Sequence, residues 1–85
     1  MNQNCLSVEV QYFAHLAQII APNCVEKLPE GDCLQDFSSH LCEKYPAAAK
    51  ILKVAKFAVN EEIKEGEYVL KASDRVCVFP PFSGG

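Results

Sequence analysis

The first part of the chain alternates between hydrophobic and polar positions from residue 7 to residue 13. Val8, Val10 and Tyr12 fall on one side of this segment, whereas Phe13 and the residues between them fall on the other. A repeat of two is the side-chain period of a strand with one buried face. The segment is therefore predicted to be the strand that opens the domain.

Two shorter elements are predicted next. Residues 15–21 place hydrophobic side chains at positions i, i+3 and i+4, the spacing of one helix face, and Pro22 ends the segment. These side chains are Leu16, Ile19 and Ile20. Residues 24–28 form a weaker strand candidate, which the turn-forming residues 29–32 close. A short helix and then a second strand should follow the first strand.

The clearest helix is predicted from Asp32 to about Tyr45. Asp32 can accept hydrogen bonds from the first free amide groups, and Gln35 stands three residues later, as in a capping box. Pro46 blocks continuation of the helix. The buried side of this helix is expected to carry Leu34, Phe37, Leu41 and Tyr45.

The second half of the chain contains several short segments. A helical turn is expected within residues 47–56, followed by a strand over residues 57–59. Turns are predicted at residues 60–62 and 65–66, and a short strand at residues 68–70.

The last strand is predicted over residues 75–79, with Val76 and Val78 facing one way. Pro80 and Pro81 have no amide hydrogen to donate to a sheet, so pairing should end there. The order of elements predicts one α+β domain over residues 1–85, with a mixed sheet packed on one main helix. A β-grasp arrangement satisfies this order, with the final strand central and residues 79–85 projecting as a flexible tail.

Size and charge restrict the classes of function. The chain has 85 residues, of which 49% are hydrophobic, and a net charge of −3. A domain of this size has no room for a deep enclosed active site, so catalysis by this chain alone is not expected. An acidic chain is unsuited to nucleic acid and to anionic membranes, which leaves proteins as the expected partners. The first residues do not resemble a secretory signal, and a cytoplasmic protein is expected.

The side chains offer little sign of catalytic or metal chemistry. The five cysteines contain no Cys-x-x-Cys pair and are expected to be reduced thiols without a bound metal. Cys33 and Cys42 are nine residues apart, which places them on opposite sides of a helix, where they cannot pair. His15 and His40 are expected in surface or packing roles. Cys77 has no base at a recognisable spacing.

The end of the chain is its most informative segment. Phe79, Pro80, Pro81 and Phe82 are concentrated where the chain should leave the domain, and such exposed apolar groups tend to mark interaction surfaces. Ser83, Gly84 and Gly85 follow them. Glycine has no Cβ and accepts almost any backbone conformation, so a Gly-Gly end can be drawn into a channel too narrow for other residues. The carboxylate of Gly85 would then be the reacting group.

Three segments carry a resemblance to a known family: VEVQYFA at residues 8–14, FAVNEE at residues 57–62 and DRVCVFPPFSGG at residues 74–85. With them the chain resembles, from Val8 to Gly85, the small sulfur-carrier subunits of molybdopterin synthase, and the element Phe-Pro-Pro-x-Ser-Gly-Gly is the most specific part. The resemblance implies a ubiquitin-like β-grasp fold. Where many members carry Arg-Glu, this chain has Ala17-Gln18.

The resemblance also implies a mechanism and partners. An E1-like activating enzyme would use ATP to adenylate the Gly85 carboxylate, and a sulfur-donor protein would supply the sulfur that turns it into a thiocarboxylate. The large synthase subunit would accept the tail and pass the sulfur to a cyclic pyranopterin precursor. Ser83 and Gly84 would thread the channel of the large subunit, and Phe79, Pro80, Pro81 and Phe82 would dock against it. The carrier itself would hold no permanent cofactor.

Three alternatives remain open from the sequence. The chain could carry sulfur for another pathway, such as thiamine synthesis or tRNA thiolation. It could be a ubiquitin-like modifier joined to lysines of target proteins. The third alternative is a stand-alone thiol enzyme that uses Cys77 or Cys24 and does not need Gly84-Gly85.

Overall fold

A computed structural model describes residues 4–81 of the chain and contains one five-stranded sheet. The strands are β1 (Cys5–Tyr12), β2 (Asn23–Pro29), β3 (Lys56–Val59), β4 (Glu62–Ile63) and β5 (Arg75–Phe79). Their order across the sheet is β2-β1-β5-β3-β4. The final strand is central, as predicted, because β5 pairs in parallel with β1 and antiparallel with β3.

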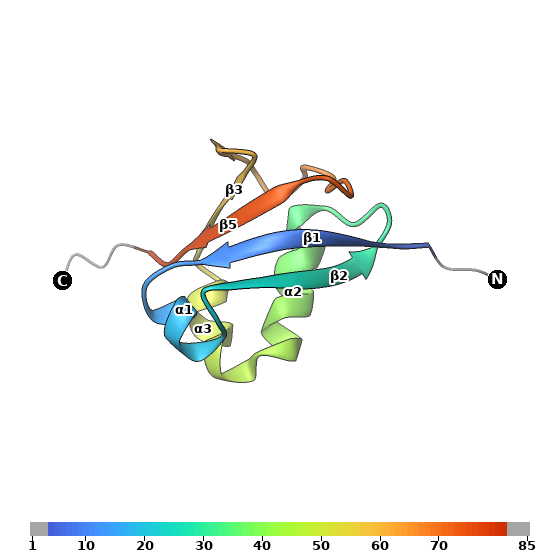
Figure 1. The fold of residues 1–85 in the computed structure, drawn as a ribbon. Helices are drawn as coiled ribbons and strands as arrows, with labels where there is room; N and C mark the ends of the chain where they lie inside the picture. The colour runs from blue at the N-terminus through green and yellow to red at the C-terminus, as the bar shows by residue number, and fades with distance from the viewer. Residues whose placement is uncertain (1–3, 82–85) are drawn as a thin grey trace.

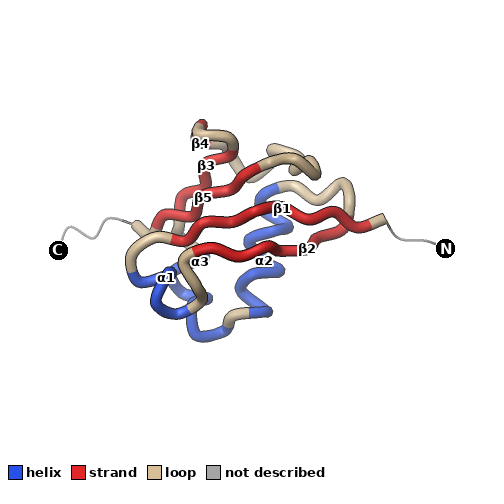
Figure 2. The backbone as a smooth tube through the Cα atoms, viewed as in Figure 1, coloured by secondary structure: helices blue, strands red, loops and turns tan. Residues whose placement is uncertain are grey.

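The helical segments cover one face of this sheet (Figure 1; Figure 2). They are α1 (His15–Ile19), α2 (Leu34–Lys44), the 3-10 helix η1 (Pro46–Ala48) and α3 (Ala49–Leu52). The longest, α2, buries Leu34, Phe37 and Leu41 against the sheet. The expected α+β architecture, a mixed sheet on one main helix, is therefore confirmed.

The core lies between the helices and the inner face of the sheet. Alternate strand residues such as Val8, Val10, Val76 and Val78 supply its sheet side, each at most 2% exposed. The side chains between them point to the opposite face, which no helix covers in the described part of the chain (Figure 2). The sheet thus has one face covered by helices and one face that no described helix covers, which we call the open face.

The predicted start of the main helix was wrong by two residues. Cys33, with extended backbone, is the N-cap, and its amide donates to Asp36 Oδ2 over 3.2 Å. Asp32 does not cap the helix; its Oδ2 lies 3.0 Å from Nε2 of His40 instead. The backbone amide of Gln35 donates to the backbone carbonyl of Gly66 over 2.9 Å. A side chain that can accept a hydrogen bond stands three positions after both residues, Gln35 after Asp32 and Asp36 after Cys33, so the sequence allows either residue to be the cap.

Two other predicted elements differ from the observed ones. Residues 68–70 do not form a strand, because their backbone bonds to the start of α2: the Leu34 amide donates to Tyr68 and the Leu70 amide to Asp32. Val69 makes a single bridge with Cys33. The predicted turn at residues 60–62 is shorter: Asn60 and Glu61 take positive φ angles of 51° and 73°, and Glu62 already belongs to β4.

None of the helices within residues 4–81 is long and apolar enough to cross a membrane.

Candidate functional site

The end of β5 is packed against the end of β1. The Phe13 amide donates to the carbonyl of Val78 over 3.2 Å. The rings of Phe13 and Phe79 stack with their centroids 4.6 Å apart and an angle of 18° between their planes. Both side chains are half-buried, and neither belongs to the core cluster. The stack therefore fixes the point at which the chain leaves the sheet.

The predicted site residues divide into two groups. Phe79 and Pro80 are half-buried, and Pro81 is exposed. Phe82, Ser83, Gly84 and Gly85 lie outside the described residues. We call Phe13, Phe79, Pro80 and Pro81 the tail base.

The open face of the sheet continues from the tail base towards β4. Gln11, Cys77, Ala58 and Ile63 are successive cross-strand partners there. Ile63 is 60% exposed. Lys56 is the partner of Phe79 and borders the tail base on the β3 side. The row from Gln11 to Ile63 is uncharged and partly apolar, which suits a protein contact better than contact with a charged ligand.

Phe13 belongs to the candidate site because it stacks on Phe79, although its sequence pattern predicted no role for it. The alternation in β1 already put it on the side opposite the core residues. What the sequence could not give is the parallel pairing of β1 with β5, which brings Phe13 beside Phe79 across 66 positions of sequence, from 13 to 79. A phenylalanine on the polar side of an alternating strand is the signal that could have identified it.

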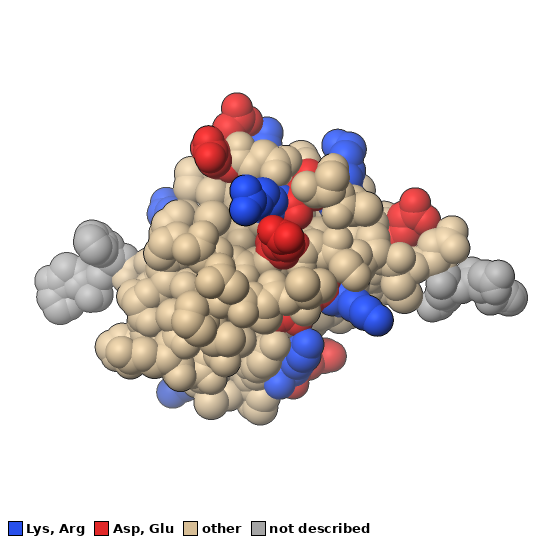
Figure 3. Space-filling model, viewed as in Figure 1, with Lys and Arg blue, Asp and Glu red and all other residues tan. Residues whose placement is uncertain are grey.

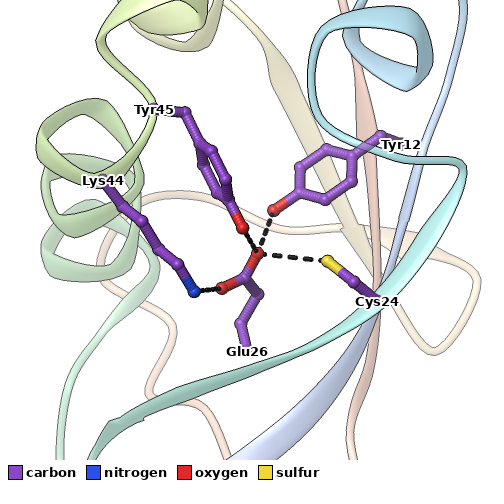
Figure 4. A network of polar contacts seen from close by, with 5 residues as sticks. All are labelled: Tyr12, Cys24, Glu26, Lys44 and Tyr45. Atoms are coloured by element: carbon purple, nitrogen blue, oxygen red, sulfur yellow. Dashed lines mark hydrogen bonds and ion pairs between the residues drawn. The ribbon is translucent and has the colours of Figure 1, made fainter.

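On the helix side of the sheet, a buried carboxylate gathers four donors (Figure 4). Glu26 is 2% exposed. Its Oε2 accepts from the hydroxyls of Tyr12 and Tyr45 over 2.9 and 2.8 Å and from the thiol of Cys24 over 3.2 Å. Its Oε1 accepts from the ammonium of Lys44 over 2.8 Å. We call these five residues the Glu26 centre.

The donors decide the protonation state of Glu26. Burial alone would raise the pKa of Glu26, but the hydrogen bonds from Lys44, Tyr45, Cys24 and Tyr12 outweigh it and hold the pKa below its usual range. Burial, reinforced by the nearby carboxylate, also raises the pKa of Tyr12. The centre is thus an ionised carboxylate ringed by neutral donors and one cation.

The same environment makes Cys24 a poor nucleophile. Burial and the hydrogen bond to Glu26 raise the pKa of the Cys24 thiol to about 11, so the reactive thiolate is scarce at neutral pH. Cys77 lies half-buried on the open face and lines a shallow hollow there with Gln11 and Val25. None of the side-chain hydrogen bonds within residues 4–81 joins a cysteine to a histidine. This arrangement does not favour a thiol enzyme.

A second buried carboxylate holds the start of β5. Asp74 is 4% exposed and accepts from the amide of Lys71, the side-chain amide of Asn60 and the hydroxyl of Tyr68, each over 2.9 Å. Burial would raise the pKa of Asp74, but these hydrogen bonds lower it overall. The side-chain oxygen Oδ1 of Asn60 accepts from the backbone amide of Arg75 over 3.0 Å. Both ends of β5 are therefore fixed.

Within residues 4–81, no three His, Cys, Asp or Glu side chains converge where they could hold a metal ion. The histidines have other surroundings: His15 is exposed at the start of α1, and His40 contacts Asp32 on the surface.

Comparison with known proteins gives one family and several close relatives. The model of the ThiS family matches residues 10–85. The chain is 29% identical over 83 residues to the molybdopterin synthase sulfur carrier subunit of Chlamydomonas reinhardtii, covering 94% of this chain and 100% of that protein. It is 33% identical over 84 residues to the protein of the same name from Caenorhabditis briggsae, covering 94% and 99%.

Solved structures agree on the fold. Small archaeal modifier protein 1 from Methanosarcina acetivorans superimposes with a TM-score of 0.75 at 26% identity, covering 96% of this chain and 99% of that one. A chain in the complex of subunits 1 and 2 of molybdopterin-converting factor from Helicobacter pylori gives 0.66 at 23%, covering 94% and 100%. A ubiquitin-like protein from Trypanosoma brucei gives 0.61 at 10%, covering 92% and 95%. The expected ubiquitin-like β-grasp fold is confirmed.

Proposed function

Because the chain belongs to the ThiS family, which it matches up to Gly85, we propose that it is the sulfur carrier subunit of molybdopterin synthase. The names of the curated relatives from Chlamydomonas reinhardtii and Caenorhabditis briggsae support this assignment. The observation that supports it most directly is that Phe79, at the end of the central strand β5, stacks on Phe13 where the described part of the chain leaves the sheet.

The proposed chemistry takes place on the Gly85 carboxylate. An E1-like activating enzyme joins a carboxylate oxygen to the α-phosphorus of ATP, and pyrophosphate leaves. A donor protein then supplies sulfur as hydrosulfide, whose sulfur attacks the carbonyl carbon; AMP leaves with that oxygen, and a thiocarboxylate remains once the hydrosulfide proton is lost. A carboxylate accepts nucleophiles poorly until one oxygen becomes part of a good leaving group, and a terminal glycine leaves its carbonyl carbon unhindered.

In the second stage, the large synthase subunit receives the thiocarboxylate. Ser83 and Gly84 thread its channel while Phe79, Pro80, Pro81 and Phe82 dock outside it, and the sulfur passes to the cyclic pyranopterin precursor. The carrier is not an enzyme on its own and keeps no cofactor; ATP is consumed by the activating enzyme. Both stages belong in the cytoplasm.

Intact-mass spectrometry tests the first stage. The full chain is incubated with its activating enzyme, ATP and a sulfur source, and we expect one oxygen to be exchanged for sulfur at the C-terminus. The matched control lacks ATP. An active activating enzyme that leaves the mass unchanged would contradict the proposal. Conversion of the precursor to molybdopterin after addition of the large subunit tests the second stage.

One finding favours a second candidate, a ubiquitin-like modifier: the match to small archaeal modifier protein 1. In that role the activated Gly85 carbonyl would be attacked by a lysine amine of a target protein, forming an isopeptide bond. Mass spectrometry of cellular proteins distinguishes the two, because only the modifier leaves Gly84-Gly85 attached to lysines. A sulfur carrier for thiamine synthesis or tRNA thiolation would differ in the acceptor of the sulfur alone.

A further inference from the structure

The end of the molecule that carries the tail base is almost free of charge. The chain has no Asp, Glu, Lys or Arg between Glu9 and Glu26, and none after Arg75. The parallel pairing of β1 with β5 brings these two uncharged segments together. Figure 3 shows a broad surface without charged side chains beside the C-terminal end, over α1 and the adjoining ends of β1 and β2.

Ile19 is an exposed side chain of α1, one of the elements that this uncharged surface covers. It is 40% exposed, and its nearest charged residues along the chain are Glu9 and Glu26. The other large hydrophobic side chains exposed within residues 4–81 each have a charged residue within two positions. They are Val25, Val54, Ile63 and Val69. Nearby charges keep an exposed apolar side chain hydrated and discourage association, and Ile19 has no Asp, Glu, Lys or Arg within six positions along the chain.

The packing of α1 explains which of its side chains face outwards. Leu16 is fully buried, and Ala17 and Ile20 pack against the core. Gln18 and Ile19 are left exposed on the other side of the helix. The Tyr12 amide donates to the carbonyl of Pro22 over 2.9 Å, which ties the far end of this segment to β1. The exposed side of α1 is therefore held in a fixed position next to the tail base.

The length of the tail limits where a partner can lie. The residue proposed to react, Gly85, is four positions after Pro81, and an extended chain of four residues spans at most about 14 Å. A protein that reacts with Gly85 must therefore approach the tail base itself. On the β3 side it meets Lys56, whereas the segment on the α1 side, residues 10–25, contains no Asp, Glu, Lys or Arg.

We propose that the exposed residues Ala14, Gln18, Ile19 and Pro22, the α1 shoulder, form a second contact surface for the large synthase subunit. This inference rests on the proposed function and adds a partner surface to it. The matching surface of the large subunit is apolar and uncharged, because a charged group placed against Ile19 would lose water without gaining a partner. The contact depends on apolar burial and is therefore insensitive to salt.

Binding of the full chain to the large subunit, measured by calorimetry, tests the α1 shoulder. Ile19→Lys should weaken binding about tenfold or more, because it brings an unpaired charge into the interface. Gln18→Lys, which removes no packing, should weaken it in the same direction. Val54→Lys is the matched control: Val54 is 59% exposed beside Lys53, and its variant should bind within about twofold of wild type.

The outcomes separate this inference from the proposed function. If both α1 variants bind like Val54→Lys while Phe79→Ala weakens binding, the α1 shoulder is not a contact surface for the large subunit, and the proposed carrier function stands. If the α1 variants impair adenylation by the activating enzyme but not binding to the large subunit, the assigned partner is wrong. If the wild-type chain does not bind the large subunit at all, the proposed function fails together with the inference. Thermal unfolding of each variant confirms that it is folded.

Discussion

The Glu26 centre and the tail base lie on opposite faces of one sheet and use opposite chemistry. In the Glu26 centre, each of the four donors reaches one carboxylate that is 2% exposed. In the tail base, two stacked aromatic rings and two prolines remain half-buried or exposed, and their contacts are apolar. One region satisfies its own polar groups completely, whereas the other leaves apolar surface uncovered.

Under the proposed function, this difference separates the residues that stabilise the fold from those that contact a partner. A buried carboxylate with several hydrogen bonds is costly to disturb, because each lost partner leaves a polar group without water. An exposed apolar surface contributes little to folding but gains when another protein covers it. Substitutions in the two regions should therefore change different quantities: unfolding free energy in the first, and partner binding or sulfur transfer in the second.

The largest effect is expected from removal of Gly84 and Gly85. The shortened chain should lose thiocarboxylate formation and synthase activity completely, because the reacting carboxylate is displaced from its place after the tail base. The urea midpoint should be unchanged, since the sheet ends at Phe79. Activity and urea unfolding measured on the same sample check the prediction. Residual activity would instead support a reaction on a side chain such as Cys77.

Glu26→Ala should give the largest loss of stability. The hydroxyl of Tyr12, which is 2% exposed, would lose its acceptor, and Tyr45 and Cys24 would lose theirs. We expect the free energy of unfolding, measured with urea, to fall by about 3 kcal/mol relative to wild type. Glu30→Ala, an exposed glutamate just after β2, is the matched control and should change the value by less than about 0.5 kcal/mol. A loss below about 1 kcal/mol for Glu26→Ala would show that the centre contributes little to stability.

Phe79→Ala should weaken partner binding more than it lowers the stability of the fold. Loss of the stacked ring and of its contact with a partner should weaken binding to the large subunit by about 2 kcal/mol, or about thirtyfold. The loss of unfolding free energy should be smaller than for Glu26→Ala, because Phe79 lies outside the core cluster. Binding calorimetry and urea unfolding give the two values. Equal effects on binding and stability would mean that Phe79 supports the fold more than the interface.

The fold was predictable from sequence wherever the period of hydrophobic side chains distinguishes the buried side of an element from its exposed side. The alternation in residues 7–13 and 75–79 and the hydrophobic spacing in α2 gave the correct element types. Residues 68–70 have the composition of a strand, but their hydrogen-bonding partners are at the start of α2 rather than in the sheet. Composition reports the preference of a segment and does not identify its partner.

The tail base could be predicted in part, and the Glu26 centre could not. Phe79, Pro80 and Pro81 were recognised because apolar residues stood where the chain should leave the domain. Glu26 lies on the same side of β2 as Cys24 and Leu28, the side that faces the core. Its donors, however, are scattered from Tyr12 to Tyr45, and only the tertiary packing of β1, β2 and α2 brings them to one carboxylate.

Acid should weaken the fold through the two buried carboxylates. The pKa values of Glu26 and Asp74 are both lowered in the folded state, so their stabilisation is complete above their unfolded pKa values of about 4 and is lost as the pH falls through the folded values. Urea midpoints measured from pH 7 to pH 2 should therefore decrease at the acid end. The double variant Glu26→Gln and Asp74→Asn should show a smaller decrease, and an equal decrease would assign the acid sensitivity to other groups.

Lys44→Met should have the smallest effect in the Glu26 centre. Lys44 Nζ lies 2.8 Å from Glu26 Oε1, but its side chain is 57% exposed, so water and salt screen the pair. Glu26 also keeps its three neutral donors, and methionine can replace the aliphatic part of the lysine. We expect a loss of about 0.5 to 1 kcal/mol in urea unfolding, which should shrink at high salt. A loss as large as that of Glu26→Ala would instead mean that the ion pair, rather than the buried hydroxyl and thiol donors, stabilises the centre.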